Sequence, residues 1–361
     1  ESMKNAVCAD GRIRGVLQFY GANRTGRWAG RLVQVQNLPH DVPVAMDTAI
    51  RLVKNGNAHG VKLMYGHIST SLSHLIRAAF VAPEGSLLCV SDFSAIEARV
   101  LSWLAGGKWR QGGFGKGGGF YLASWCAMFC GAGGKTRIKR NLRQKGKVAE
   151  LALGYQGGPP ALITMGALKQ GLTEDELPDI VHRWRGANPR ICGLWYDVDG
   201  AALSVMSDAC PVGLPHGILI SRECNLLYGY DYLTIQLPSG RKLYYPQPYI
   251  NENQFGKPAL HYRVQAGIKW SHTSTYGGKL VENITQAIAR DCLALAINRL
   301  VKAGYKPLMH IHDEVVLEVS KDKIHEDEID RINQIMCAPI PWAPGLLLNA
   351  DGFISPYYTK D

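Results

Sequence analysis

Long apolar runs are missing from this sequence. No stretch approaches 18 consecutive apolar residues, and Glu1–Asn5 lacks the hydrophobic segment of a secretory signal. We therefore expect no membrane association and a soluble, intracellular protein. Internal repeats are missing too, and the one low-complexity stretch, the Gly-rich Gly106–Gly119, has no phosphate-loop pattern and indicates a plain solvated connection.

Clustered cysteines are also missing. The nine cysteines are scattered and odd in number, which is typical of reduced thiols and not of a disulfide framework. Cys126 and Cys130 would share one side of a helix, but no second pair of ligands follows them. Apolar packing is a better interpretation of this pair than a metal site.

Acidic residues are fewer than basic ones. Lys and Arg number 40 against 30 Asp and Glu, which gives a net charge of +10. This balance favours a polyanionic partner, with nucleic acid ahead of a membrane surface. The 361 residues, 46% of them hydrophobic, are enough for a sizeable core in two or three compact units.

Two aspartates, Asp92 and Asp313, each follow an apolar strand-like run. Carboxylates on adjacent strands can hold two Mg²⁺ ions about 4 Å apart, an arrangement that indicates phosphoryl transfer. Structural interpretations stay open for both segments. Ser94 and Glu97 fit the S-x-x-E capping box of a helix start, and His312–Glu314 fits a polar hairpin turn.

A basic segment lies between the two aspartates. Arg143, Lys147, Leu151 and Tyr155 recur at spacing four, which predicts one face of a helix. The Arg fork and the Lys ammonium suit a triphosphate tail. A merely solvated surface helix is the alternative, and the position between two metal-type aspartates favours the triphosphate.

Periodicity predicts several further elements. Helical patterns cover 120–157, which includes the basic run Lys135–Arg143, and also 172–190, 196–208 and 280–303. Alternation on either side of Pro238–Gly240 predicts a hairpin of Tyr232–Leu237 with Arg241–Tyr245.

Six segments resemble those of family A (DNA polymerase I-like) DNA polymerases of the phage or prophage type, and they follow one another along the chain in the family's order. Asp92–Arg99 resembles motif A, Arg143–Tyr155 motif B and His312–Glu314 motif C. The upstream matches are Thr25–Arg27, Gln36–Pro39 and Ala79–Gly85.

The resemblance implies an α+β right-hand polymerase fold. Its palm, an antiparallel sheet with helices, would comprise 1–105 and 226–361, and mostly helical fingers would comprise 106–225. Since about 24 residues precede Thr25, we expect a thumb and an exonuclease domain to be largely absent from this chain. Those domains, or a processivity partner, would complete the enzyme.

The implied reaction is DNA-dependent DNA synthesis. Such an enzyme adds dNTPs to the primer 3′-hydroxyl of primer-template DNA and releases pyrophosphate, using two Mg²⁺ ions or Mn²⁺ as a substitute. The setting would be the cytoplasm of a bacterial or phage-infected cell.

The resemblance also implies roles for single residues. Asp92, Asp313 and the Phe93 backbone carbonyl would bind metal, with Glu314 as a supporting carboxylate. Arg143 and Lys147 would hold the triphosphate, with Lys147 also a general acid. The remaining nucleotide contacts would come from Ser94, Glu97 as a gate against a ribose 2′-hydroxyl, Leu151 and Tyr155, and the DNA contacts from Arg27, Gln36, Asn37, Gln286 and His312.

Two departures from the family pattern stand out. Leu151 occupies a position where the family usually has Phe or Tyr, so we expect poor use of dideoxynucleotides. The interval from motif B to Gln286 is long, which marks 225–280 as an insertion.

Two other functions stay open. A single-subunit RNA polymerase-like enzyme would share the aspartates and the basic helix, although Glu97 argues against it. A catalytically weak DNA-binding fragment is the other alternative.

Overall fold

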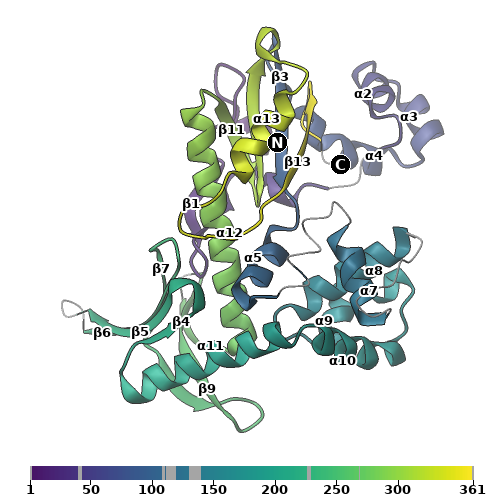
Figure 1. Ribbon diagram of the computed structural model, residues 1–361. Coiled ribbons are helices and arrows are strands. Elements are labelled where there is room, and N and C mark those ends of the chain that lie inside the picture. Colours follow the sequence, from purple (N-terminus) through teal and green to yellow (C-terminus); the bar gives the residue numbers. More distant parts are fainter. Residues whose placement is uncertain are drawn as a thin grey trace. The chain divides into compact units, whose positions relative to one another are not determined.

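The computed structural model describes residues 2–39, 43–107, 110, 119–129, 140–225, 229–267 and 269–359. The chain folds into two compact units (Figure 1). Unit 1 comprises Glu1–Ser94, Cys292–Ala338 and Asn349–Asp361, and unit 2 comprises Ala95–Asp291 and Pro339–Leu348. Much of the Gly-rich stretch, most of the basic run Lys135–Arg143 and Cys130 lie outside the described residues.

A four-stranded antiparallel sheet organises unit 1, in the strand order β11-β12-β3-β13. Its strands are β3 (Ser86–Phe93), β11 (Lys306–Ile311), β12 (Glu314–Ser320) and β13 (Ala350–Ser355). The central strands β3 and β12 are rich in buried apolar side chains, as is usual for strands covered on both faces.

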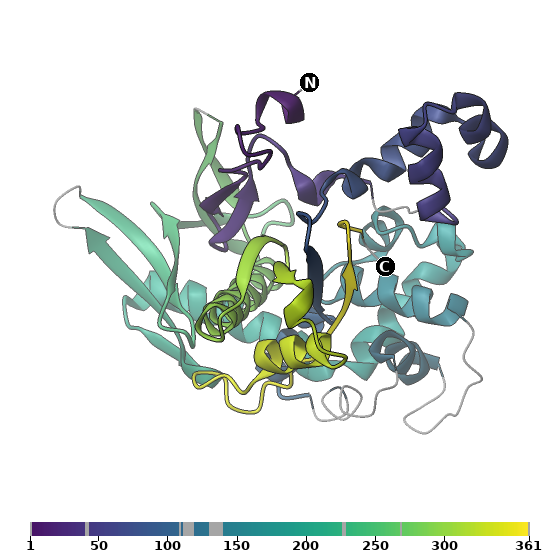
Figure 2. The same cartoon turned by 90° about the horizontal axis from the view of Figure 1, so that it is seen from above.

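Each face of this sheet is covered by different segments of unit 1. Leu88, Val90 and Val316 point into one cluster with Val33 and Tyr358. On the opposite face lies α13 (Glu328–Cys337), beside β3 and β13 in Figure 2. A Cβ on Gly352 would meet the Val90 carbonyl oxygen at 2.3 Å and Ile329 at 2.8 Å, so this position of β13 requires glycine.

The rest of unit 1 is a hairpin and short helices. β1 (Leu17–Ala22) pairs with β2 (Arg27–Gly30), and α2, α3 and α4 pack on one another (Figure 2). The helices are α1 (Ser2–Asn5), η1 (Val35–Asn37), α2 (Met46–Lys54), α3 (Ala58–Tyr65), α4 (Ile68–Leu75), η2 (Ile76–Ala79) and η6 (Lys321–Lys323).

Helices make up the larger part of unit 2. They are α5 (Ile96–Ala105), α7 (Phe120–Phe129), α8 (Arg140–Leu153), α9 (Pro159–Thr164), η3 (Leu168–Gln170), η4 (Glu174–Glu176), α10 (Leu177–Ala187), α11 (Pro189–Asp208), η5 (Pro215–Gly217) and the first part of α12 (Gly277–Lys302). Trp184 of α10 and Trp195 of α11 stack in the core at 6.1 Å between ring centroids.

Two antiparallel sheets complete unit 2. One has the strand order β4-β5-β6-β7 and the other β10-β9-β8. Their strands are β4 (Val212–Leu214), β5 (Ile218–Asn225), β6 (Tyr230–Gln236), β7 (Lys242–Pro246), β8 (Tyr249–Glu252), β9 (Pro258–Ala266) and β10 (Lys269–Ser274).

Several predicted elements are confirmed, with shifted ends. The hairpin is β6–β7, closed by a hydrogen bond from the Leu237 amide to the Arg241 carbonyl, and the 280–303 helix is α12. The predicted 172–190 and 196–208 helices were misplaced at their ends, since α10 starts at Leu177 and α11 already at Pro189. Asn188 breaks the helix between them, at φ −127°, immediately before a proline that disfavours helical backbone there.

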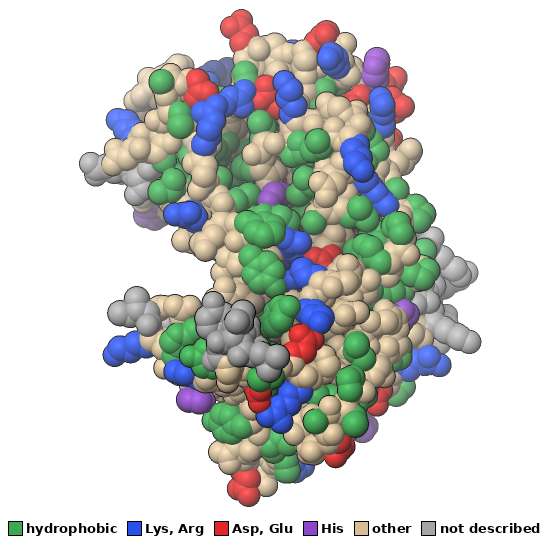
Figure 3. All heavy atoms as spheres, turned by 90° about the vertical axis from the view of Figure 1, so that its left-hand side faces the viewer, with side chains coloured by type: hydrophobic (Ala, Val, Ile, Leu, Met, Phe, Trp, Pro, Cys, Tyr) green, Lys and Arg blue, Asp and Glu red, His purple; other side chains and the backbone are tan. Residues whose placement is uncertain are grey.

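The surface mixes charge with apolar side chains. Figure 3 shows one face, on which Lys and Arg side chains lie interspersed with exposed hydrophobic ones. The described cysteines are free thiols. None of the described helices combines the length and the apolar character needed to cross a membrane.

Candidate active site

The two aspartates of unit 1 lie at adjoining ends of neighbouring strands. Asp92 is the penultimate residue of β3, and Asp313 directly precedes β12. The Phe93 amide donates to the Asp313 carbonyl at 3.2 Å, which fixes the two segments side by side. His312 and Asp313 form the β11–β12 turn, as the hairpin interpretation predicted, while Glu314 already begins β12; this turn brings Asp313 to β3.

Two further carboxylates lie in line with Asp92. Glu314 of β12 and Asp351 of β13 are its direct partners on the two neighbouring strands. Directly opposed side chains of antiparallel strands share one face, with Cβ atoms about 5 Å apart. The sequence prediction missed Asp351, because nothing local in Ala350–Ser355 indicates which strand it pairs with.

The capping-box interpretation of Ser94, left open by the sequence, is wrong. The N-cap of α5 is Ala95, in left-handed backbone at φ 53°, and it makes no side-chain cap hydrogen bond. The Ser94 hydroxyl instead donates to Asp351 Oδ2 at 2.6 Å, and the Ser94 amide donates to the Asn349 carbonyl at 2.8 Å. A carboxylate from a distant strand is therefore a partner of this serine.

Glu314 is buried and belongs to a chain of hydrogen bonds. The Tyr358 hydroxyl donates to Glu314 Oε1 at 2.7 Å, and Arg77 Nη1 donates to that hydroxyl at 3.0 Å. Arg77 also donates to the carbonyls of Leu38 and Pro39, both at 2.7 Å. Burial first, and then the negative charge of Glu314, raise the pKa of Tyr358. A buried network therefore connects the β12 end to the Gln36–Pro39 segment.

Two of the predicted DNA contacts in unit 1 lie together. Arg27 Nη2 is 3.3 Å from His312 Nδ1, and Trp28 packs edge-on against His310 at 4.5 Å between ring centroids. His312 adopts left-handed backbone at φ 56°, which turns the chain tightly before Asp313. The β1–β2 hairpin thus meets the β11–β12 turn.

The Gln36 and Asn37 side chains occupy the same region of unit 1. A Cβ on Gly30 would meet the Gln36 amide at 2.2 Å, so the Gln36 side chain lies directly over the end of β2. Asn37 is exposed, and its Nδ2 donates to Gln34 Oε1 at 2.5 Å.

In unit 2, α8 presents the predicted basic face. Arg143 is exposed, Lys147 half-buried and Leu151 43% exposed. The opposite side of α8 is buried, and a Cβ on Gly146 would meet the Tyr121 carbonyl oxygen at 1.9 Å. Glycine at this position lets α8 lie close against α7, which leaves the cationic side outward.

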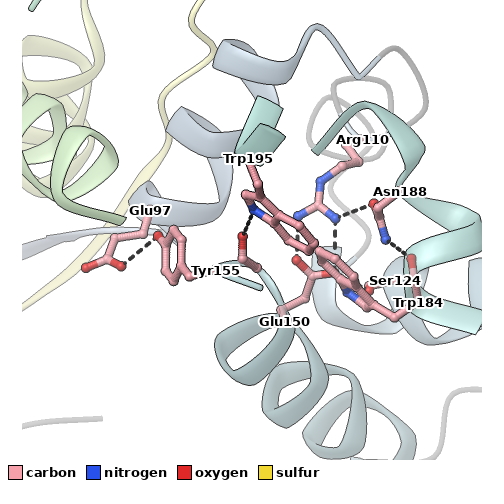
Figure 4. A network of polar contacts seen from close by, with 9 residues as sticks. Glu97, Arg110, Ser124, Glu150, Tyr155, Trp184, Asn188 and Trp195 are labelled. Carbon is pink, nitrogen blue, oxygen red and sulfur yellow. Dashed lines mark hydrogen bonds and ion pairs between the residues drawn. The ribbon is translucent and has the colours of Figure 1, made fainter. Parts of the chain in front are cut away.

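Tyr155 lies beyond that helix, which corrects the prediction that it shares a helical face with Arg143. α8 ends at Leu153, and left-handed backbone at Gln156, φ 67°, turns the chain. The Tyr155 hydroxyl donates to Glu97 Oε2 at 3.1 Å (Figure 4). Burial, and secondly the charge of Glu97, raise the pKa of Tyr155 well above its ordinary value, so the phenol remains a donor.

A buried cluster supports α8 from behind. Glu150 pairs with Arg110, accepts from Ser124 and accepts from Trp184 Nε1 at 3.0 Å, while Arg110 donates to Asn188 at 2.8 Å (Figure 4). We call these five residues the Glu150 cluster. Hydrogen bonds from Ser124 and Trp184 to Glu150, and from Arg110 to Asn188, surround the ion pair, and such bonds help a buried ion pair to be tolerated.

Gln286, the remaining predicted DNA contact, lies in unit 2. It is half-buried on α12, and its Nε2 is 3.4 Å from Glu282 Oε1. The start of α12 is tied to the turn after α8, because the Gly278 amide donates to Gln156 Oε1 at 3.0 Å.

The donor set around Asp92 suits a hard cation. Carboxylate oxygens are what Mg²⁺ prefers, and it is commonly bound by one or two carboxylates together with substrate phosphates. Within the described residues, no group of three or more His, Cys, Asp and Glu side chains is placed to hold a metal ion. Asp92 and Asp313 supply two carboxylates, the donor type that fits Mg²⁺.

The fold is similar to that of a solved polymerase domain. It matches a solved structure described as the polymerase domain of Pol1 from M. smegmatis in complex with DNA primer-template and dNTP, with a TM-score of 0.64 and 17% identity. The match covers 99% of this chain and 50% of that one. The α+β fold predicted from the motifs is confirmed.

In sequence, the chain is a homologue of a phage DNA polymerase. It is 52% identical to the DNA polymerase of Bacillus phage SP02 over 363 aligned residues, which cover 100% of this chain. The chain spans about half (54%) of the length of that relative. No family model matches. The resemblance to family A polymerases of the phage type is confirmed by the two relatives together.

Proposed function

We propose that this chain is the palm and fingers part of a template-directed DNA polymerase, which adds dNTPs to a primer 3′-hydroxyl and releases pyrophosphate. One observation carries the proposal: Asp92 and Asp313 are held side by side at adjoining strand ends by the backbone bond between Phe93 and Asp313. The 52% identity to a phage DNA polymerase supports it.

The palm would comprise 1–105 and 226–361, and the fingers 106–225. The four-stranded sheet of unit 1 supports the palm assignment, because it carries both aspartates. The helices α7, α8 and α10 support the fingers assignment, since α8 carries the cationic residues.

Asp92, Asp313 and the Phe93 carbonyl would hold two Mg²⁺ ions, with substrate phosphates as further ligands. Such ions, when bound, activate the attacking 3′-hydroxyl and neutralise the leaving phosphate. Glu314 would not bind metal, because the Tyr358 hydroxyl donates to its carboxylate within the buried network. It would position β12 instead.

Arg143 and Lys147 would bind the triphosphate. One turn apart on the outer side of α8, they offer a fork of donors and a point charge to phosphate oxygens. Lys147 would donate a proton to the departing pyrophosphate, and its half-buried position keeps that ammonium close to the helix.

Glu97 would select against ribonucleotides. Its carboxylate is fixed by the Tyr155 hydroxyl at 3.1 Å, and a fixed side chain excludes a 2′-hydroxyl better than a mobile one. Tyr155 would then close the pocket against the templating base, while Ser94 and Leu151 would line the nucleotide.

The DNA partner would be a primer-template, as in the solved Pol1 complex. Arg27 and His312, joined at 3.3 Å, would approach the primer end. Gln36, Asn37 and Gln286 would check base-pair shape through minor-groove acceptors common to all correct pairs. The enzyme would act in the phage-infected cell and would be completed by the remainder of a longer polymerase or by a processivity partner.

Extension of a labelled primer annealed to a longer template, with Mg²⁺ and dNTPs, tests the proposal. We expect extension by the wild-type chain, and its loss in Asp92→Asn and in Asp313→Asn. Asp322→Asn, a carboxylate outside the sheet on η6, is the matched control and should extend normally. Undiminished extension by either aspartate variant contradicts the assignment, and preferential use of rNTPs would indicate an RNA polymerase-like enzyme instead.

A further inference from the structure

The three-stranded sheet of unit 2, β8-β9-β10, has one packed face and one open face. Leu260 and Tyr262 of β9 are buried, and Tyr262 meets the buried Tyr245 of β7 edge-on at 5.0 Å between ring centroids. Asn283 of α12 donates to the Tyr245 hydroxyl at 3.0 Å. Tyr262 on the packed face therefore contacts a side chain that is itself bonded to α12. The sheet lies within residues 225–280, which contain none of the residues assigned to the proposed reaction (Figure 1).

Alternate residues of the three strands form the opposite face. The register places Tyr249 opposite His261, Arg263 opposite His272, and Gln265 opposite Trp270. We call this the outer face; its residues are the exposed or half-buried Tyr249, Asn251, His261, Arg263, Gln265, Trp270, His272 and Ser274, together with Ala259, which is buried. It contains no Asp or Glu, which leaves Arg263 and the histidines without an acidic neighbour on that face.

Aromatic and basic groups are interleaved on the outer face. The Arg263 guanidinium lies over the Trp270 ring at 5.5 Å, and Arg263 Nη1 donates to Gln247 at 3.0 Å. Tyr249 stacks on His261 at 5.3 Å and meets His272 at 5.6 Å. These contacts hold the rings in place, yet Trp270 is 53% and Tyr249 37% exposed.

We infer that the outer face binds single-stranded nucleic acid, with unpaired DNA as the ligand. Every base has a π-face that stacks on an aromatic ring, and cationic side chains beside such rings meet the phosphates. From strand spacing and residue rise, Trp270 and Tyr249 are about 16 Å apart, which corresponds to a site of a few nucleotides. A duplex hides its base faces and would not use these rings.

The charge pattern of the outer face suits a polyanion. Arg263 lies beside Trp270 and opposite His272, and the face has no carboxylate that would repel a phosphate. The outer face shares no residue with the proposed reaction, so the two proposals succeed or fail independently.

Binding of a fluorescently labelled oligo-dT of about 16 nucleotides to the whole chain tests the inference, by anisotropy at low salt. We expect Trp270→Ala and Tyr249→Ala each to weaken binding roughly 5- to 100-fold, as loss of one base-stacking ring does. Trp270→Phe should retain most of the affinity. Arg263→Gln should weaken binding and also flatten its salt dependence, because one phosphate contact is lost.

Tyr244→Ala is the matched control, since Tyr244 is a 47% exposed tyrosine on β7, outside the outer face. It should bind oligo-dT like the wild type. Affinity within twofold of wild type in both ring variants, or an equal loss in Tyr244→Ala, overturns the inference. The assay contains neither primer nor dNTP, so its result does not depend on whether the chain polymerises DNA.

Discussion

Removing the Tyr358 hydroxyl should destabilise unit 1 without changing its packing. Tyr358→Phe keeps the fully buried ring under Arg77 but deletes the group that donates to Glu314 and accepts from Arg77. Both partners carry charge and both are buried, and a hydrogen bond to such a group is worth about 1.5–3 kcal/mol. We expect the free energy of unfolding to fall by about 2–4 kcal/mol.

Urea unfolding followed by circular dichroism measures this loss, and the next residue provides the control. The Tyr357 hydroxyl donates to Asp47 at 2.8 Å in an exposed position, so Tyr357→Phe should cost less than about 1 kcal/mol. If Tyr358→Phe costs no more than Tyr357→Phe, the buried network contributes nothing and the reasoning fails.

The same substitution has a signature at alkaline pH. Because the pKa of Tyr358 is raised in the native state, the unfolded chain loses this proton first, above pH 10.0, the ordinary value. The stability due to a protonated Tyr358 is complete below pH 10.0 and declines as pH rises, by about 1.4 kcal/mol per pH unit. Tyr358→Phe lacks this decline, so the difference between the two proteins should shrink above pH 10.0.

Three further predictions concern unit 2. Glu150→Gln leaves the buried Arg110 guanidinium without its counter-charge, so urea titrations should show a free energy of unfolding lower by about 3–5 kcal/mol. The control is Asp179→Asn, which breaks an exposed ion pair with Arg183 and should cost less than about 1 kcal/mol. Leu151→Tyr should raise ddNTP incorporation in primer extension, because it supplies the missing hydroxyl; unchanged termination would remove Leu151 from the nucleotide site. Glu97→Ala should raise rNTP use roughly tenfold or more relative to dNTP use, and an unaltered ratio would exclude the gate.

Several features followed from sequence alone because they depend on short-range chemistry. Period-two alternation around Pro238–Gly240 produced the β6–β7 hairpin, and the three- to four-residue period after Leu280 produced α12. The aspartates were predicted at strand ends for the same reason, since a polar residue after an apolar run marks the end of a buried strand.

Other features depended on partners distant in the chain. Ser94 and Glu97 satisfy the spacing of a capping box, yet Ser94 bonds Asp351, 257 positions away, and Glu97 bonds Tyr155, 58 positions away. A local motif shows which hydrogen bonds a side chain could make. The tertiary fold selects among these bonds, because it brings distant partners within reach of the side chain.

The sequence by itself carried the proposed reaction class, because that proposal rests on the carboxylates, the Arg and Lys of α8 and their order along the chain. Only the tertiary structure decided how these groups are held. Strand pairing aligned Glu314, Asp92 and Asp351 across three strands, and burial made Tyr358 the group that ties Glu314 to Arg77. Register and burial are properties of contacts between distant segments, so no local pattern contains them.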